Sequence, residues 1–242
     1  MINFITLQLI KFFDYFNKLK ILKFLKNNNL NTLDIFFDVG AHNGESIDFF
    51  LTNFKIKKIY SFEASPINFQ KLKKKLSHFL KKFGEVNIVI ENIALGAEQK
   101  KATLKQFNES SSSTFSTINN NSSYFKKKYK FLNKKKKGNF FYNIDTNIVP
   151  LAHYLKKNNI NKIDFLKIDT EGYELEVLIG LKNTIKNVRI IFFEHHYDNM
   201  IEKKYKFQNI HNLLSSNHFK KIYKSKMPFR KTFEYIYTNT LI

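Results

Sequence analysis

Asp34-Ile-Phe-Phe-Asp-Val-Gly-Ala-His-Asn-Gly44 is the stretch that decides the fold of this 242-residue chain. It is a short apolar run of strand-forming residues that ends in two glycines, and a helical pattern follows over residues 46–54. Gly40 and Gly44 let the backbone turn sharply and come close to a ligand. The helix after them offers free N–H groups to a carboxylate or a phosphate. The order of strand, glycine loop and helix therefore predicts a cofactor-binding turn in an α/β protein.

The spacing of the two glycines narrows the kind of cofactor. It is G-x-x-x-G, which differs from the G-x-G-x-x-G of dinucleotide-binding loops. Glu63 ends the next strand-like run, residues 58–62, about 20 residues past the glycines. An acidic side chain at that place can accept hydrogen bonds from both hydroxyls of a ribose. The glycine pair and Glu63 together predict an adenosine-containing cofactor.

The alternation of strands and helices continues along the chain. Further strand-like runs cover residues 86–90, 163–168 and 188–193, and helical patterns cover residues 66–80 and 174–181. Apolar strands separated by helices predict a mostly parallel, doubly wound sheet with helices on both faces. Residues 219–224 and 233–238, joined through Pro228, predict an antiparallel pair that closes the sheet.

Residues 101–148 interrupt this alternation. They hold two strand-like runs, separated by a Ser- and Asn-rich stretch at 108–123 and a lysine run at 134–137. This order predicts a hairpin-like insertion whose tip is mobile. We expect the insertion to belong to a single domain over residues 34–242, because that length suffices for one core and is too short for two ordinary domains.

Residues 1–33 predict an amphipathic helix. Polar residues recur there mostly at three- to five-residue steps, with apolar residues between them. We expect this helix to cap the core, and peripheral membrane contact through residues 1–30 is the alternative. No 18-residue stretch of the chain lacks a charge, so no membrane-spanning helix is predicted.

The chain carries 41 Lys and Arg against 20 Asp and Glu, a formal net charge of +21. Such a charge fits an anionic partner such as nucleic acid or a membrane surface. The excess is almost entirely Lys, in a chain also rich in Asn, Ile and Phe, and these four residues share A/T-rich codons. We favour this compositional origin, because a phosphate-binding surface would use more Arg. The absence of cysteine excludes disulfides, thiolate zinc sites and cysteine nucleophiles, and it fits a cytoplasmic protein.

Three successive motifs resemble those of the FkbM family of methyltransferases, which use S-adenosylmethionine on a class I, Rossmann-like fold. They are Asp38-Val-Gly-Ala-His-Asn-Gly44, Ser61-Phe-Glu-Ala-Ser-Pro66 and Ile163-Asp-Phe-Leu-Lys-Ile-Asp-Thr-Glu-Gly172. Val149-Pro150-Leu151 and Glu194 also match the family pattern. The resemblance covers about residues 34–194, and Lys-Ile-Asp-x-Glu-Gly is its most discriminating part.

The resemblance implies S-adenosylmethionine as the cofactor, and it implies which residues bind it. Asp38, Gly40, Gly44 and Asp169 would lie at its methionine end, Glu63 at the ribose, and Asn92 at the adenine edge. The family more often has Asn at the position of His42 and Pro at the position of Ala64. Asn43 is the neighbour expected to replace the side chain lost at position 42.

Candidate catalytic residues cluster at the carboxyl ends of the fourth and fifth core strands, where ligands bind in such sheets. They are Asp169, Glu171, Glu194 and His195, with His196 beside them. Methyl transfer is an in-line displacement that depends on positioning, and a hydroxyl acceptor must also lose a proton to a nearby base. Glu171 has an alternative role as an acid at the start of the helix after Gly172. These side chains are of metal-ligand types, but the resemblance requires no metal and we expect none.

Three functions are compatible with these residues. The first, by analogy with the family, is O-methylation of a small-molecule or sugar hydroxyl, such as one in a surface glycan. The second is ribose 2′-O-methylation of RNA, which the charge motivates, with Lys167 and Asp169 as conceivable participants. The lack of adjacent prolines and of cysteine argues against enzymes that methylate RNA bases. The third is a non-catalytic basic binding protein of the same fold, without affinity for the cofactor.

Overall fold

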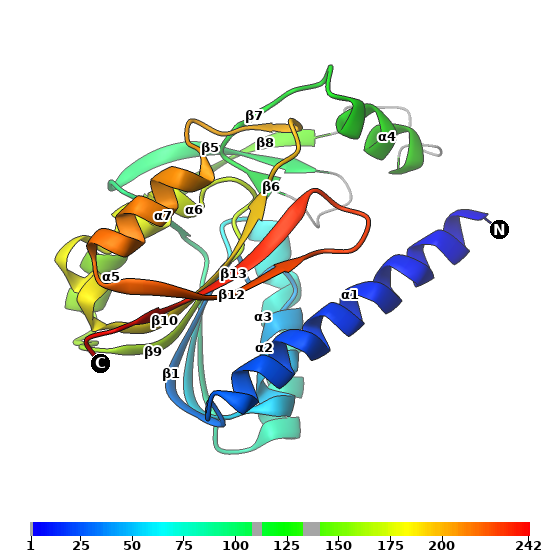
Figure 1. The fold of residues 1–242 in the computed structure, drawn as a ribbon. Helices are drawn as coiled ribbons and strands as arrows, with labels where there is room; N and C mark the ends of the chain where they lie inside the picture. The colour runs from blue at the N-terminus through cyan, green and yellow to red at the C-terminus, as the bar shows by residue number, and fades with distance from the viewer. Residues whose placement is uncertain (1, 108–112, 133–140) are drawn as a thin grey trace.

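A computed structural model describes residues 2–107, 113–132 and 141–242 of the protein. Its centre is a seven-stranded sheet in the order β12-β13-β10-β9-β1-β2-β3 (Figure 1). The parallel strands are β1 (Thr32–Val39), β2 (Lys55–Phe62), β3 (Asn87–Glu91), β9 (Ile163–Ile168) and β10 (Val188–His196). β13 (Thr232–Asn239) runs antiparallel to both of its neighbours, β10 and β12 (Phe219–Lys226). The predicted mostly parallel sheet with an antiparallel C-terminal strand is confirmed.

Helices cover both faces of the sheet (Figure 1). One face carries α1 (Ile2–Asn27), α2 (Glu45–Asn53) and α3 (Pro66–Phe83), and the other carries α5 (Leu151–Lys157), α6 (Glu174–Ile179), a 3₁₀ helix (Lys182–Asn187) and α7 (Phe207–Ser216). Phe36 and Phe37 of β1 point to opposite faces, as neighbouring side chains of a strand do. Phe36 packs against Phe50 of α2, and Phe37 packs against Tyr154 of α5. Each face therefore has its own apolar core.

β1 lies in the middle of the sheet, and strands that follow it in the sequence lie on both sides of it. β2 and β3 lie on one side of it, and β9 and β10 lie on the other. In such sheets ligands bind outside the carboxyl ends of the strands, at the point where the order reverses. Val39 is in register with Phe62 on one side and with Ile168 on the other. The loops after β1, β2 and β9 therefore meet at one edge of the sheet.

The predicted hairpin-like insertion forms a second, smaller sheet. Its main strands, β5 (Lys100–Phe107) and β8 (Phe141–Val149), pair antiparallel, with β4 (Ala94–Leu95) and β6 (Ser113–Thr114) at the edges. From residue 113 onward the polar stretch forms β6, β7 (Thr117–Ile118) and α4 (Ser123–Leu132) in place of the mobile tip expected there. These elements form because their apolar side chains pack into a small core, in which Ile118 and Phe125 are buried against Phe107 and Met200. Residues 108–112 and the lysine run at 134–137 lie outside the described residues.

The predicted N-terminal helix is α1, and its C-terminal part packs on the sheet. Ile21 and Leu25 are buried in the core on the side of α2. Earlier in the helix, Asp14 forms an ion pair with Arg230 at 2.7 Å, and Asn17 is buried against β12 and β13. Among the helices in the described part of the chain, none is long and apolar enough to cross a membrane.

Candidate active site

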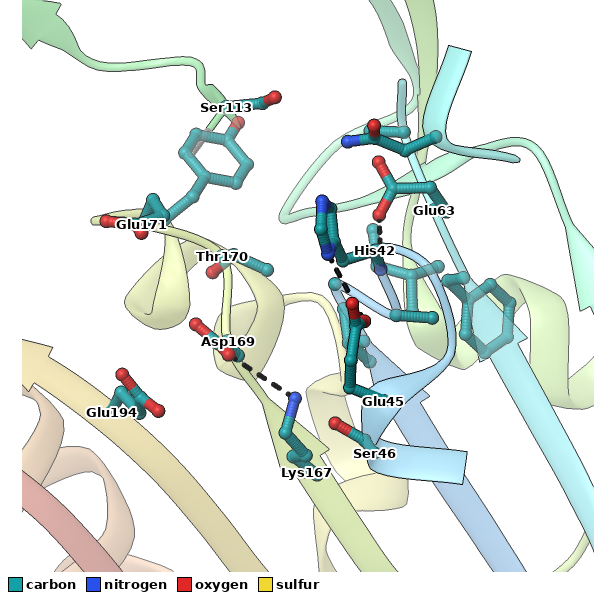
Figure 2. A pocket seen from close by; sticks show the side chains of 18 of the residues that line it. His42, Glu45, Ser46, Glu63, Ser113, Lys167, Asp169, Thr170, Glu171 and Glu194 are labelled. Atoms are coloured by element: carbon teal, nitrogen blue, oxygen red, sulfur yellow. Dashed lines mark hydrogen bonds and ion pairs between the residues drawn. The ribbon is translucent and has the colours of Figure 1, made fainter. Parts of the chain in front are cut away.

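A cavity of about 280 Å³ lies at the carboxyl edge of the sheet, where the loops after β1, β2 and β9 meet (Figure 2). Apolar side chains form part of its wall, among them Phe62, Ile93 and Leu95. Six acidic side chains also line it: Glu45, Glu63, Asp169, Glu171, Glu194 and Glu234. In Figure 2, Glu63 lies on one side of the open space and Glu194 on the other. The cavity therefore has one end near β2 and another near β10.

The glycine loop after β1 makes direct contact with the loop after β9. Gly40 has φ +83°, and a Cβ there would lie 1.9 Å from the carbonyl oxygen of Asp169. Gly44 also has φ +83°, and a Cβ there would lie 2.9 Å from Leu72 and Phe79 of α3. Side chains other than that of glycine rarely adopt this left-handed backbone. Both positions thus require glycine, and the close packing at Gly40 brings two of the sequence motifs together.

Glu63 is held in one orientation at the end of β2. It is 6% exposed, and its two carboxylate oxygens accept hydrogen bonds from the backbone N–H groups of His42 (2.7 Å) and Ser65 (2.9 Å). Burial raises the pKa of this carboxyl, and the two N–H groups oppose the rise. Each carboxylate oxygen has a further lone pair. Glu63 can therefore also accept hydrogen bonds from a ligand in the cavity.

His42 stands where the resemblance implied Asn, and it fits the backbone of the glycine loop. Its φ is +50°, in the left-handed region that Asn, Asp and His adopt more readily than other residues with a side chain. Its Nδ1 lies 3.2 Å from the carboxylate of Glu45. Burial alone would lower the pKa of His42 and raise that of Glu45, but their contact outweighs burial. The pKa of His42 is therefore raised, and that of Glu45 falls to about 2.

Asn43 and Asn92, both predicted to bind the cofactor, are not among the residues that line the cavity. The side chain of Asn92 donates a hydrogen bond to the carbonyl oxygen of Glu63 (2.8 Å) and so supports the loop after β2. The side-chain nitrogen of Asn43 lies 3.3 Å from Nε2 of His42, and its backbone N–H donates to Glu45 (3.1 Å). In this geometry both asparagines shape the loops that carry Glu63 and His42.

A buried ion cluster lies beside the cavity. Lys167 of the Lys-Ile-Asp-x-Glu-Gly motif places its Nζ 3.2 Å from Asp38 and 3.5 Å from Asp169. Burial disfavours the charge of Lys167, but the carboxylates of Asp38, Asp169 and Glu194 outweigh burial and raise its pKa. Asp38 is fully buried, and burial raises its pKa against the opposing charge of Lys167. Asp38 therefore acts on the site through Lys167, whereas Asp169 and Lys167 line the cavity themselves.

Of the predicted catalytic residues, Asp169, Glu171 and Glu194 line the cavity and His195 does not. Neighbouring residues of β10 point to opposite faces, so His195 faces α7. It packs there against Tyr197, with ring centroids 4.8 Å apart. His195 is 2% exposed, and burial is the main cause that lowers its pKa to about 3. The structure thus separates His195 from the three carboxylates.

Glu171 lines the cavity and does not cap the helix that follows. The acidic residue at the start of this helix is Glu174, and its carboxylate accepts a hydrogen bond from the backbone N–H of Gly172 (2.9 Å). Glu171 has φ +50°, and its carbonyl oxygen accepts a hydrogen bond from the hydroxyl of Thr114 in the insertion (2.7 Å). Its carboxylate lies 3.3 Å from Nε2 of His196. A strained backbone held by its surroundings is typical of residues at functional sites.

Glu234 and Lys18 are among the cavity residues that no sequence motif identifies. Glu234 lies on β13 and Lys18 lies on α1. The signal that could have found Glu234 is its place in the strand predicted over 233–238, which pairs with the strand that carries Glu194. Within the described ranges, no three His, Asp or Glu side chains are grouped as the ligands of a metal ion would be.

Comparison with known families connects this geometry to the motifs. The profile of the Methyltransferase FkbM domain matches residues 38–221 of the chain. The chain belongs to the FkbM methyltransferase family. The matched range of this FkbM-family chain contains the glycine loop, Glu63, Asp169 and Glu194, whereas α1 and β13 lie outside it. No protein with a curated description matches the chain.

Solved structures share the fold of this FkbM-family chain at low sequence identity. The methyltransferase FkbM from Methylobacillus flagellatus KT has a TM-score of 0.56 and 15% identity, over 86% of this chain and 44% of its own. The chain thus spans less than half of that protein. The magnesium protoporphyrin IX methyltransferase from Synechocystis PCC 6803 has TM-scores of 0.51 with bound SAM and 0.52 with bound SAH. These two structures are 10% identical to the chain and cover 96% of it, and the chain covers 82% and 85% of them. The predicted class I methyltransferase fold is confirmed.

Proposed function

We propose that this FkbM-family chain transfers a methyl group from S-adenosylmethionine to a hydroxyl group of a sugar, a glycan or another small molecule. The observation that carries the proposal is one cavity with two chemically different ends. Near β2, two backbone N–H groups hold the carboxylate of Glu63, which can also accept hydrogen bonds from the hydroxyls of a ribose. At the other end, Glu171 offers a carboxylate to a hydroxyl that must lose its proton.

The residues near β2 fit the cofactor. Glu63 keeps lone pairs for the ribose hydroxyls, and the apolar side chains of Phe62, Ile93 and Leu95 beside it suit the adenine ring. Because Gly40 has no Cβ, its backbone can lie directly against the loop that carries Asp169. The carboxylate of Asp169 suits the ammonium group of the methionine part of the cofactor. When bound, S-adenosylmethionine supplies a methyl group on a positively charged sulfur. The chain then has to position the acceptor, exclude water and remove a proton.

Glu171 is the residue that we assign to proton removal. It lines the cavity, and the hydrogen bond from Thr114 fixes its backbone. Nε2 of His196, 3.3 Å from the carboxylate, can stabilise its negative charge. A positioned base of this kind contributes about 10²–10⁴-fold to the rate. We therefore expect Glu171→Gln to lose turnover by about that factor and to keep its affinity for the cofactor. Full activity of Glu171→Gln would remove it from this role.

Calorimetric titration with S-adenosylmethionine tests the cofactor part of the proposal. We expect binding to the intact chain and a loss of affinity of at least about tenfold in Glu63→Ala, because hydrogen bonds to a charged acceptor are lost. Glu98→Ala is the matched control, since the side chain of Glu98 is 76% exposed and lies outside the cavity. No binding to the intact chain would instead favour a non-catalytic basic protein, and equal binding by Glu63→Ala would exclude Glu63 from the cofactor site.

A further inference from the structure

Glu194 and Glu234 stand directly opposite each other on neighbouring strands. They are register partners in the antiparallel pair of β10 and β13, and both line the cavity. Side chains of directly opposite residues share one face and come close together, and like charges in such a pair destabilise a sheet. Two glutamates at this place therefore impose a cost on folding, which suggests a use for them in the cavity.

Few hydrogen-bond donors satisfy these two carboxyl groups. Glu234 is 4% exposed and accepts a hydrogen bond from the side chain of Asn17 on α1. The carboxyl group of Glu194 receives no hydrogen bond from any residue in the described part of the chain. It is only partly buried and faces the open space (Figure 2). Its oxygens are therefore available to a molecule in the cavity.

The groups around the pair favour a shared proton. β9 contributes Lys167, the loop after it contributes Asp169 and Glu171, and α1 contributes Asp14 and Lys18. Desolvation inside the cavity, followed by the nearby carboxylates, raises the pKa of Glu194 well above its ordinary range. Burial likewise raises the pKa of Glu234 to about 7, although Asn17 opposes the rise. Both raised pKa values favour the retention of a proton by this coupled pair near neutral pH.

A carboxylic acid beside a carboxylate offers one strong donor and several acceptors. Neighbouring sugar hydroxyls each donate and accept, so they match this pair. A phosphate group only accepts near neutral pH, and it would meet six acidic side chains against Lys18, Lys167 and His42 in the cavity wall. The charge of the cavity is thus opposite to the net charge of +21 of the whole chain.

We propose that the pair of Glu194 and Glu234, covered by α1, binds the methyl acceptor, and that this acceptor is a sugar unit without phosphate. The inference rests on the proposed methyltransferase function and names its substrate class. Asn17 and Glu234 lie outside residues 38–221, the range that matches the family profile. This part of the site is therefore a feature of the chain beyond the motifs of the family.

The first test follows labelled methyl groups from S-adenosylmethionine into two fractions of a cell extract, phosphate-free polysaccharide and RNA. The enzymes compared are the intact chain, Glu194→Gln, Glu234→Gln, the double variant, and the exposed control Glu98→Gln. We expect label in the polysaccharide, and a loss of at least about tenfold in kcat/KM for the double variant, mostly through KM. Its affinity for S-adenosylmethionine should stay within about twofold of that of the intact chain.

The outcomes separate the two proposals. No binding of S-adenosylmethionine to the intact chain would reject the methyltransferase function itself. Binding with label only in RNA, or undiminished labelling of polysaccharide by the double variant, would reject the sugar-binding pair and leave the enzyme. A second measurement needs no acceptor: infrared spectra near neutral pH should show a protonated carboxyl that is absent from the double variant of Glu194→Gln and Glu234→Gln. If that band is missing from the intact chain, the shared proton and the proposed pair are wrong.

Discussion

Gly40 is the residue at which the smallest change should have the largest structural effect. A Cβ there would lie 1.9 Å from the carbonyl oxygen of Asp169, a backbone atom that cannot rotate away. We expect Gly40→Ala to lower the free energy of unfolding by more than the cost of the left-handed backbone alone, about 1–2 kcal/mol, and to abolish cofactor binding. Thermal unfolding and calorimetry with S-adenosylmethionine measure the two effects.

Gly84 provides the matched control for this substitution. Its φ is +67°, and a Cβ there would meet no atom within 4 Å. Gly84→Ala should therefore lose stability only through the strain of its positive-φ backbone, without a clash, and should leave cofactor binding intact. Equal losses of stability in the two variants would show that the contact between the loops after β1 and β9 does not constrain the site.

Glu234 makes stability depend on pH in a defined direction. Its pKa is about 7 in the folded chain against an ordinary value of 4.5, so the folded state holds the proton more tightly than the unfolded state. The free energy of unfolding should therefore fall as pH rises from about 4.5 to about 7, by an amount on the order of 3 kcal/mol. Glu234→Gln does not titrate and should gain stability relative to the intact chain across this window, by denaturant unfolding at each pH. If the difference in free energy of unfolding between Glu234→Gln and the intact chain stays constant from pH 4 to pH 8, the raised pKa of Glu234 is wrong.

At the scale of secondary-structure elements, α1 is attached to the sheet by a few polar contacts near the cavity. Asn17 donates to Glu234 and accepts a hydrogen bond from the hydroxyl of Ser225 (2.7 Å), and Asp14 pairs with Arg230. We expect Asn17→Ala to lower the free energy of unfolding by about 1–3 kcal/mol, because a buried carboxyl loses its donor. It should also speed proteolytic cleavage within α1.

The control for this helix is Lys20→Ala, since Lys20 is exposed on the same helix. It should change stability by less than about 0.5 kcal/mol. If Asn17→Ala behaves like this control, the helix does not depend on its contact with β13, and the proposed closure of the acceptor site by α1 loses its support.

At the scale of the whole molecule, the cavity differs in charge from the chain as a whole. The chain has a net charge of +21, yet acidic side chains outnumber lysines in the cavity wall. If the acceptor is a sugar without phosphate, kcat/KM should change by less than about threefold between 50 and 200 mM salt. Contacts with 6–10 phosphates would lose about 10³–10⁵ in affinity over that range. A steep salt dependence would therefore favour RNA as the acceptor.

The sequence by itself determined the order of the core strands and helices and the position of the glycine loop. These features depend on neighbouring residues: apolar runs that suit a two-sided sheet, and glycines where φ is positive. It also placed Glu63, Asp169, Glu171 and Glu194 at strand ends, and the carboxyl ends of parallel strands must meet at one edge. Family membership followed from the same local motifs.

Only the tertiary structure decided which of these side chains share a cavity. Glu194 and His195 are neighbours in sequence, and the strand pairing turns one to the cavity and the other to α7. Glu234 and Asn17 are 217 positions apart and meet because α1 folds back over the sheet. Local patterns carry no information on such contacts, since register and helix docking are set by packing across the whole sheet. Of the proposed site, Glu63 and Asp169 at the cofactor end were thus predictable from the sequence, whereas the pair at the proposed acceptor end required the fold.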